Sequence, residues 1–100
     1  MIKYTQYDVN MQQEDKILQF HKAVGSVFKE IRENNSGKSI SRFAREYDID
    51  RGNLSKMERG KLSCRILTAW KIAEAAGIKF SDFAKLLEDK LGDGFKIFDE

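Results

Sequence analysis

Residues 51–59 carry side chains whose types and spacing suit contacts with nucleic-acid bases. At 100° per residue, Leu54, Met57 and Glu58 lie on one side of a helix, and the opposite side is polar, basic and partly bare. Gly52, Lys56 and Arg59 point outward with Ser55 beside them, and the long side chain of Arg51 can reach round from the first turn. The candidate base-reading residues are Arg51, Gly52, Asn53, Ser55 and Lys56. Arg and Lys suit guanine and Asn suits adenine, so this face fits the major groove of DNA. An ordinary solvated helix face would show the same pattern, and this helix alone leaves both interpretations open.

Positive charge gathers around that helix, where it suits contacts with phosphate. Residues 38–61 carry seven Lys or Arg against four Asp or Glu, a net charge of +3, whereas residues 62–100 carry six against seven, a net charge of −1. The candidate phosphate contacts are Lys38, Ser39, Arg42, Arg59 and Lys61. Such contacts give DNA affinity that depends on salt and not on sequence.

Two short helices joined by a tight turn must position these side chains. Ser39 is a good N-cap, because its hydroxyl can accept a hydrogen bond from a free amide in the first turn. Asp48 and Asp50 interrupt the helical pattern, since Asp favours turns and caps. Asp50 is expected to cap the second helix, which ends at Gly60. We therefore predict a helix-turn-helix unit over residues 39–60.

Three further helices are expected to surround this unit. One runs from Asp15 to about Glu33, where Gly25-Ser26 marks a kink or a close helix contact, and a loop follows at residues 34–37. Its apolar stripe is Ile17, Phe20, His21, Val24, Val27, Phe28 and Ile31. The next spans residues 65–76, with Ile66, Ala69, Trp70, Ile72, Ala73 and Ala76 as its buried face. The last follows Ser81 as its N-cap and ends near Leu91. The chain is thus expected to be all-α.

The two ends of the chain are less regular in pattern. Residues 1–14 are rich in β-forming side chains with partial alternation, and residues 92–100 have a similar character. Each is expected to be either a short β-strand or a loose arm or tail. Two such strands could pair within one chain or between two copies.

Composition bounds the function. The 100 residues suit one small domain, and neither a long apolar run nor a signal-peptide pattern occurs, so we expect a cytoplasmic protein without a membrane segment. One Cys and one His, Cys64 and His21, stand without a metal-ligand cluster or a phosphate-binding loop. We therefore expect no enzymatic activity, no metal and no cofactor.

The full order of these features resembles the lambda-repressor-like, Cro-like helix-turn-helix proteins, also called the XRE type. The resemblance covers about Val24 to Leu87. Its main signals are Val24-Gly25 with Phe28, Ile31 and Arg32; Ser39 with Phe43-Ala44; Ile49-Asp50; the run Leu54 to Gly60; and Ala73, Gly77-Ile78, Phe80 and Phe83. It implies a five-helix DNA-binding domain over residues 15–91, with helix 51–59 in the major groove. It also implies that Glu58 forms a structural ion pair with Arg32.

The chain departs from the family pattern at four positions. Ile40 stands where Gln is frequent, Lys38 where an apolar residue is usual, and Cys64 where the link usually contains Pro. Gly52 is unusual in a recognition helix. It either permits close approach of the backbone to the groove or is a tolerated weak point in the first turn.

The resemblance implies a sequence-specific regulator of transcription, most simply a repressor, which binds double-stranded DNA and lies with the nucleoid when bound. We expect a homodimer, formed through the C-terminal helices or the terminal strands, since two half-sites require two reading helices. The alternative is an antitoxin or protein-interaction module of a toxin–antitoxin or mobile-element pair, with a toxin or an anti-repressor as its partner.

Overall fold

Five α-helices and one π-helical turn make up the described part of the chain. The computed structural model describes the backbone of residues 2–98 and the side chains of residues 13–98. The elements are α1 (Ile2–Ile31), the π-helical turn η1 (Arg32–Ser36), α2 (Ile40–Glu46), α3 (Arg51–Glu58), α4 (Ile66–Ala75) and α5 (Phe80–Leu91). The expected all-α class with five helices is confirmed.

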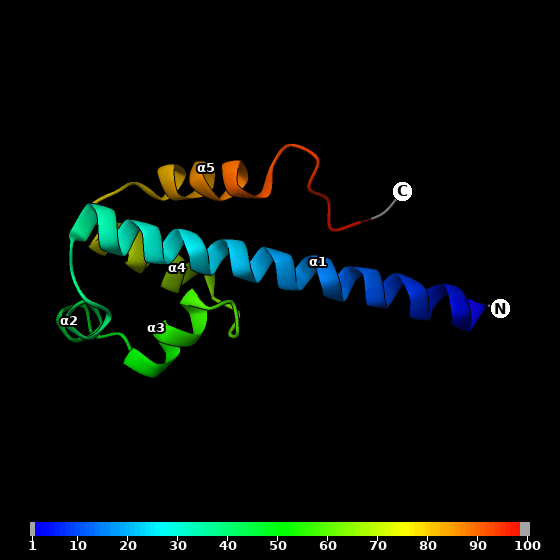
Figure 1. Ribbon diagram of the computed structural model, residues 1–100, viewed down its shortest axis with the longest axis horizontal. Coiled ribbons are helices and arrows are strands. Elements are labelled where there is room, and N and C mark those ends of the chain that lie inside the picture. Colours follow the sequence, from blue (N-terminus) through cyan, green and yellow to red (C-terminus); the bar gives the residue numbers. More distant parts are fainter. Residues whose placement is uncertain (1, 99–100) are drawn as a thin grey trace.

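The long helix α1 is the axis of the molecule. In Figure 1 it runs along the whole length, with α5 on one side, α2 and α3 on the other, and α4 behind it. Its C-terminal half buries Val27, Phe28 and Ile31 against Phe43 of α2 and Leu54 of α3. Ile72 of α4 and Phe83 of α5 complete this core, and the rings of Phe28 and Phe83 stack with centroids 5.3 Å apart. One core therefore holds the helix-turn-helix unit against α1.

Neither terminal segment forms a β-strand within the described residues. The N-terminal segment is helical, which neither of its two expected forms predicted, whereas residues 92–98 are an irregular tail, as one of the two alternatives predicted. Helix α1 begins at Ile2 and not at Asp15, and its N-terminal half projects beyond the other helices (Figure 1). Residues 92–98 form no strand, and Phe95 instead packs near Phe20, with ring centroids 6.3 Å apart. A strand needs a partner, whereas extending an existing helix adds one hydrogen bond per residue without a new nucleus. Residues 1, 99 and 100 of these two segments lie outside the described part.

Two local expectations also need correction. The loop expected at residues 34–37 is largely the π-helical turn η1, which ends at Gly37 with a positive φ of 67°. Helix α5 begins at Phe80, so Ser81 is not its N-cap; the Asp82 carboxylate instead accepts a hydrogen bond from the Lys79 backbone N–H at 3.1 Å. An acid at the third helical position can accept in this way from the backbone N–H of the capping residue, as in one half of a capping box.

The buried face of α4 is narrower than expected. Ala69, Ile72 and Ala73 are buried, but Ile66 is 74% exposed and Trp70 is 53% exposed. Periodicity marks an apolar stripe, and α1 and α5 cover only part of its width. The outer face of α4 is consequently an exposed apolar surface. Within the described part of the chain, no helix combines the length and the apolar character needed to cross a membrane.

Candidate nucleic-acid interface

Side-chain caps start both helices of the helix-turn-helix unit. The Ser39 Oγ atom accepts from the Arg42 backbone N–H at 3.2 Å, and the Asp50 Oδ1 atom accepts from the Asn53 N–H at 2.8 Å. Both predicted caps are confirmed. Between them, Asp48 has a φ of 54°, a left-handed conformation that Asp tolerates better than most residues. The two caps and the left-handed residue between them therefore account for the turn through local interactions.

Helix α3 presents one polar face to solvent. Leu54 and Met57 are buried in the core, whereas Arg51, Asn53 and Lys56 are exposed. Gly52 is exposed as well, and Ser55 is half-buried. The predicted base-reading residues therefore share the accessible side of α3, with Ser55 at its margin.

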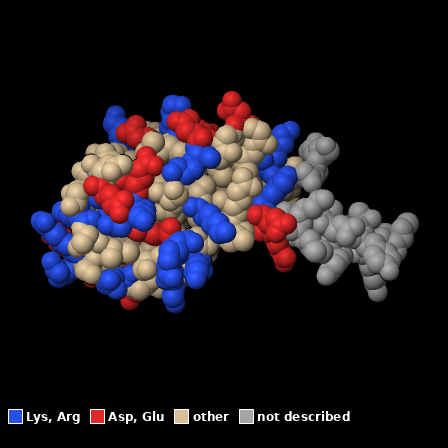
Figure 2. Space-filling model, viewed as in Figure 1, with Lys and Arg blue, Asp and Glu red and all other residues tan. Residues whose placement is uncertain are grey.

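The predicted phosphate contacts lie around the start of α2 and at the C-terminal end of α3. Ser39, Arg42, Arg59 and Lys61 are exposed, whereas Lys38 is half-buried. Lys and Arg side chains follow the edge of the molecule where α2 and α3 lie, interrupted by acidic groups (Figure 2). The Arg59 Nε atom donates to the Ser55 carbonyl oxygen at 3.2 Å, which holds the stem of this side chain along its own helix.

One carboxylate engages two of these cations. Glu46 accepts from Lys38 Nζ through Oε1 and from Arg42 Nε through Oε2, each at 2.6 Å. The two hydrogen bonds lower the pKa of Glu46 to about 2, so the carboxylate is ionised at any working pH. Lys38 also donates to the Tyr47 hydroxyl at 2.9 Å. Lys38 and Arg42 therefore contribute less free positive charge than their number suggests.

Arg32 and Glu58 form a two-bond pair between the end of α1 and the end of α3. The Arg32 Nε atom lies 2.7 Å from Glu58 Oε2, and Nη2 lies 3.0 Å from Oε1. The two side chains are only 8% and 6% exposed. The Arg32 Nη1 atom also donates to the Lys38 carbonyl oxygen at 2.8 Å, and the bond to Glu58 raises the pKa of the guanidinium. The pair therefore joins α1 to α3 in a buried position, away from the exposed face of α3.

Ser41 and Glu46 are the contacts that the sequence interpretation missed. Ser41 accepts a hydrogen bond from the Arg51 Nε atom at 2.6 Å. Glu46 was detectable, since it follows Arg42 by four residues on one helix. The Ser41 contact spans ten residues across the turn, and no periodic signal marks it.

Cys64 and His21, the single Cys and the single His of the sequence, line one apolar hollow of about 220 Å³ between α1, α4 and α5. Burial raises the pKa of the Cys64 thiol to about 11, and the thiol donates to the Arg65 carbonyl oxygen. His21 packs edge-on against Phe20. A neutral thiol is a weak nucleophile. In residues 13–98, no group of three or more His, Cys, Asp or Glu side chains could hold a metal ion.

Comparison with known proteins identifies the family. The model of the helix-turn-helix family matches residues 28–83, more than half of the chain, from the last turn of α1 to Phe83 of α5. No curated protein and no solved structure matches the chain significantly. The matched family is one of DNA-binding regulators that bind double-stranded DNA, and it is not an enzyme family. The chain therefore belongs to the helix-turn-helix family of the XRE, lambda-repressor-like type.

Proposed function

We propose that this protein is a sequence-specific transcriptional repressor that reads the major groove of DNA with α3. The observation that supports this most is the exposed face of α3, where Arg51, Asn53 and Lys56 lie opposite a fully buried Leu54. Arg and Lys match the acceptors of guanine, and Asn matches the donor and acceptor of adenine. Gly52 lies on the same face, and a methyl group there would meet only the Asp50 Oδ1 atom at 3.3 Å. Gly52 therefore allows the backbone of α3 to approach the base edges closely.

Phosphate contacts would fix the orientation of α3 in the groove. Arg59 and Lys61 flank Gly60 as exposed cations, and the Ser39 hydroxyl proton remains free to donate to a phosphate oxygen. Arg42 and Lys38 would add less, because Glu46 already compensates part of their charge. Such a domain represses by occupying DNA that polymerase would otherwise use.

Two substitutions test the proposal, one at a base-reading residue and one at a phosphate contact. Arg51→Ala should cost about 1–3 kcal/mol on the preferred sequence and relax the preference at one base pair. Lys61→Ala should weaken binding to all sequences alike and flatten the salt dependence by about one unit of slope. Titrations at several salt concentrations, on the preferred site and on scrambled DNA, measure both. An equal loss on every sequence for Arg51→Ala would remove Arg51 from the base-reading set.

Neutralising Glu46 should strengthen DNA binding, whereas the two substitutions above weaken it. Glu46→Gln removes the anion that holds Lys38 and Arg42, so affinity for DNA of any sequence should rise about two- to tenfold, with a salt slope steeper by up to about one unit. Because the pKa of Glu46 is about 2, the gain should be the same at all pH values above about 4. Glu88→Gln is the matched control, since it makes the same change in net charge at an exposed residue of α5. Equal gains in the two variants would show that only net charge matters.

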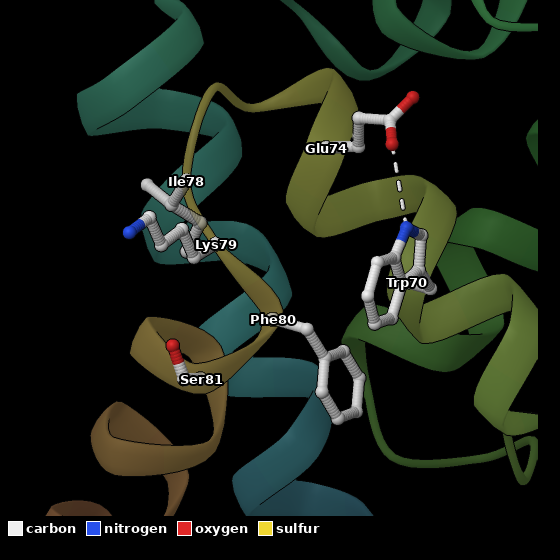
Figure 3. A pocket seen from close by; sticks show the side chains of 6 residues that line it. All are labelled: Trp70, Glu74, Ile78, Lys79, Phe80 and Ser81. Atoms are coloured by element: carbon white, nitrogen blue, oxygen red, sulfur yellow. Dashed lines mark hydrogen bonds between the residues drawn. The ribbon is translucent and has the colours of Figure 1, made fainter.

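The proposed partner is a second copy of the chain, joined through the outer face of α4. Ile66, Leu67 and Trp70 are 74%, 65% and 53% exposed there. Figure 3 shows Trp70 beside Phe80, with stacked rings 5.4 Å apart, over a hollow of about 570 Å³. Glu74 and Lys79 both border this hollow, so a symmetric partner could pair each with its opposite charge. An isologous contact needs such a self-complementary surface.

The length of α3 also favours two copies. Its eight residues span about 12 Å, enough for only a few base pairs. Selection of bound sequences from a random DNA pool should therefore return a palindrome with half-sites about 10 base pairs apart. A single asymmetric half-site would instead favour the alternative, in which a toxin or another protein covers the exposed face of α4.

A further inference from the structure

A hydrogen bond across the turn controls the direction of the first side chain of α3. The Arg51 Nε atom donates to the Ser41 Oγ atom at 2.6 Å, which joins the second residue of α2 to the first residue of α3. Both side chains are exposed. Arg loses considerable rotamer freedom when its head group is fixed, so a contact made before DNA arrives reduces the entropy lost on binding.

The bond leaves the reading atoms of Arg51 available. It uses Nε alone, and within residues 13–98 the two terminal nitrogens donate to no other group. These nitrogens provide the fork that matches the O6 and N7 atoms of guanine. Serine is also neutral, so it does not compensate the positive charge of the guanidinium. Arg42 is the contrasting case, because its Nε atom donates to the ionised Glu46 carboxylate.

Neighbouring side chains in α2 do not supply the same contact. The Ser39 hydroxyl caps α2, and Ile40 has no polar atom and packs against the core. Ser41 is thus the first residue of α2 with an oxygen that is directed to α3. We propose that Ser41 is a positioning residue, which orients Arg51 for recognition of guanine. This inference rests on the proposed function, and it adds a residue outside α3 to the determinants of sequence preference.

The test compares Ser41→Ala with Ser41→Thr, which keeps the hydroxyl, in the full chain. Pool selection with the unmodified protein and with Arg51→Ala first identifies the base pair at which this substitution relaxes the preference. Ser41→Ala should then lose about three- to tenfold of the preference for guanine at that base pair, and retain its affinity for scrambled DNA. Ser41→Thr should restore the preference. Ser63→Ala, at another exposed serine, is the matched control and should leave the preference unchanged.

A double-mutant cycle separates positioning from an independent contact. If Ser41 acts through Arg51, Ser41→Ala should have no further effect on base preference in an Arg51→Ala background. Additive effects, or an equal loss on all four bases, would overturn the inference and make Ser41 a simple phosphate contact. Unmodified protein that selects no sequence from the pool would overturn the proposed function and this inference together, whereas a clear preference that Ser41→Ala leaves unchanged would overturn the inference alone.

Discussion

Gly25→Ala should destabilise the protein by about 3 kcal/mol or more, although Ala is the better helix former. A Cβ atom at Gly25 would lie 2.2 Å from the Met57 carbonyl oxygen and 2.6 Å from that of Glu58. Both are backbone atoms at the end of α3, so no side chain can rotate away. The gain in helix propensity, about 1 kcal/mol, cannot compensate for separating two packed helices. Thermal and denaturant unfolding should show the loss, at about 4–8 °C in Tm per kcal/mol.

The same substitution at Gly52 is the matched control. Gly52 is also helical, but it is exposed, and its new Cβ would approach only the Asp50 side chain, at 3.3 Å. Gly52→Ala should therefore change stability by no more than about 1 kcal/mol, toward greater stability if propensity dominates. Because Gly52 is proposed to allow close approach to the base edges, the Gly52→Ala variant should fold normally and bind DNA more weakly. Similar stabilities for Gly25→Ala and the unmodified protein would refute the close contact of α1 with α3.

A second close approach lies one turn earlier along α1 and just past the end of α3. Gly60 has a φ of 73°, and a Cβ there would lie 2.8 Å from the Lys22 Cα atom. The backbones of α1 and of the end of α3 therefore approach each other at two glycines in succession. Because this crossing sets the tilt of α3, Gly25→Ala should also weaken DNA binding in the fraction that remains folded.

The helix-turn-helix unit was predictable because its signals are local. Ser39 and Asp50 cap their helices through bonds within the first turn, and Gly60 ends α3 in a left-handed conformation. The short range of these interactions lets a sequence pattern predict them. The glycine at position 25 also suggested a close contact, although not the partner helix.

The features that were missed depend on distant partners. Ile66 and Trp70 fit the apolar stripe of α4, but exposure depends on which helices cover that stripe, and α1 and α5 cover one side of it. The residues after Met1 resemble a strand in composition, yet no strand is formed in residues 2–98 to pair with them. Tertiary context overrides propensity in both cases.

Removing one partner of the Arg32–Glu58 pair should cost about 3–5 kcal/mol, a large share of the 5–15 kcal/mol typical of a small domain. Glu58→Ala would leave a buried guanidinium with the Lys38 carbonyl oxygen as its main partner. Glu33, 3.8 Å away and half exposed, is too solvated to replace Glu58. Arg keeps its proton at any working pH, so the unpaired guanidinium cannot avoid the penalty by becoming neutral.

Replacing both partners separates the penalty of an unpaired charge from the worth of the pair itself. Arg32→Met with Glu58→Leu removes both charges and keeps similar volume, so the double variant should regain most of the stability lost in either single variant. Denaturant unfolding of the four proteins at one pH gives the coupling energy. If the two single substitutions each cost less than about 1 kcal/mol, the pair is more solvated than its exposures of 8% and 6% indicate. A large coupling energy together with an unchanged base preference would show that Arg32 and Glu58 hold α3 in place and do not contact the bases.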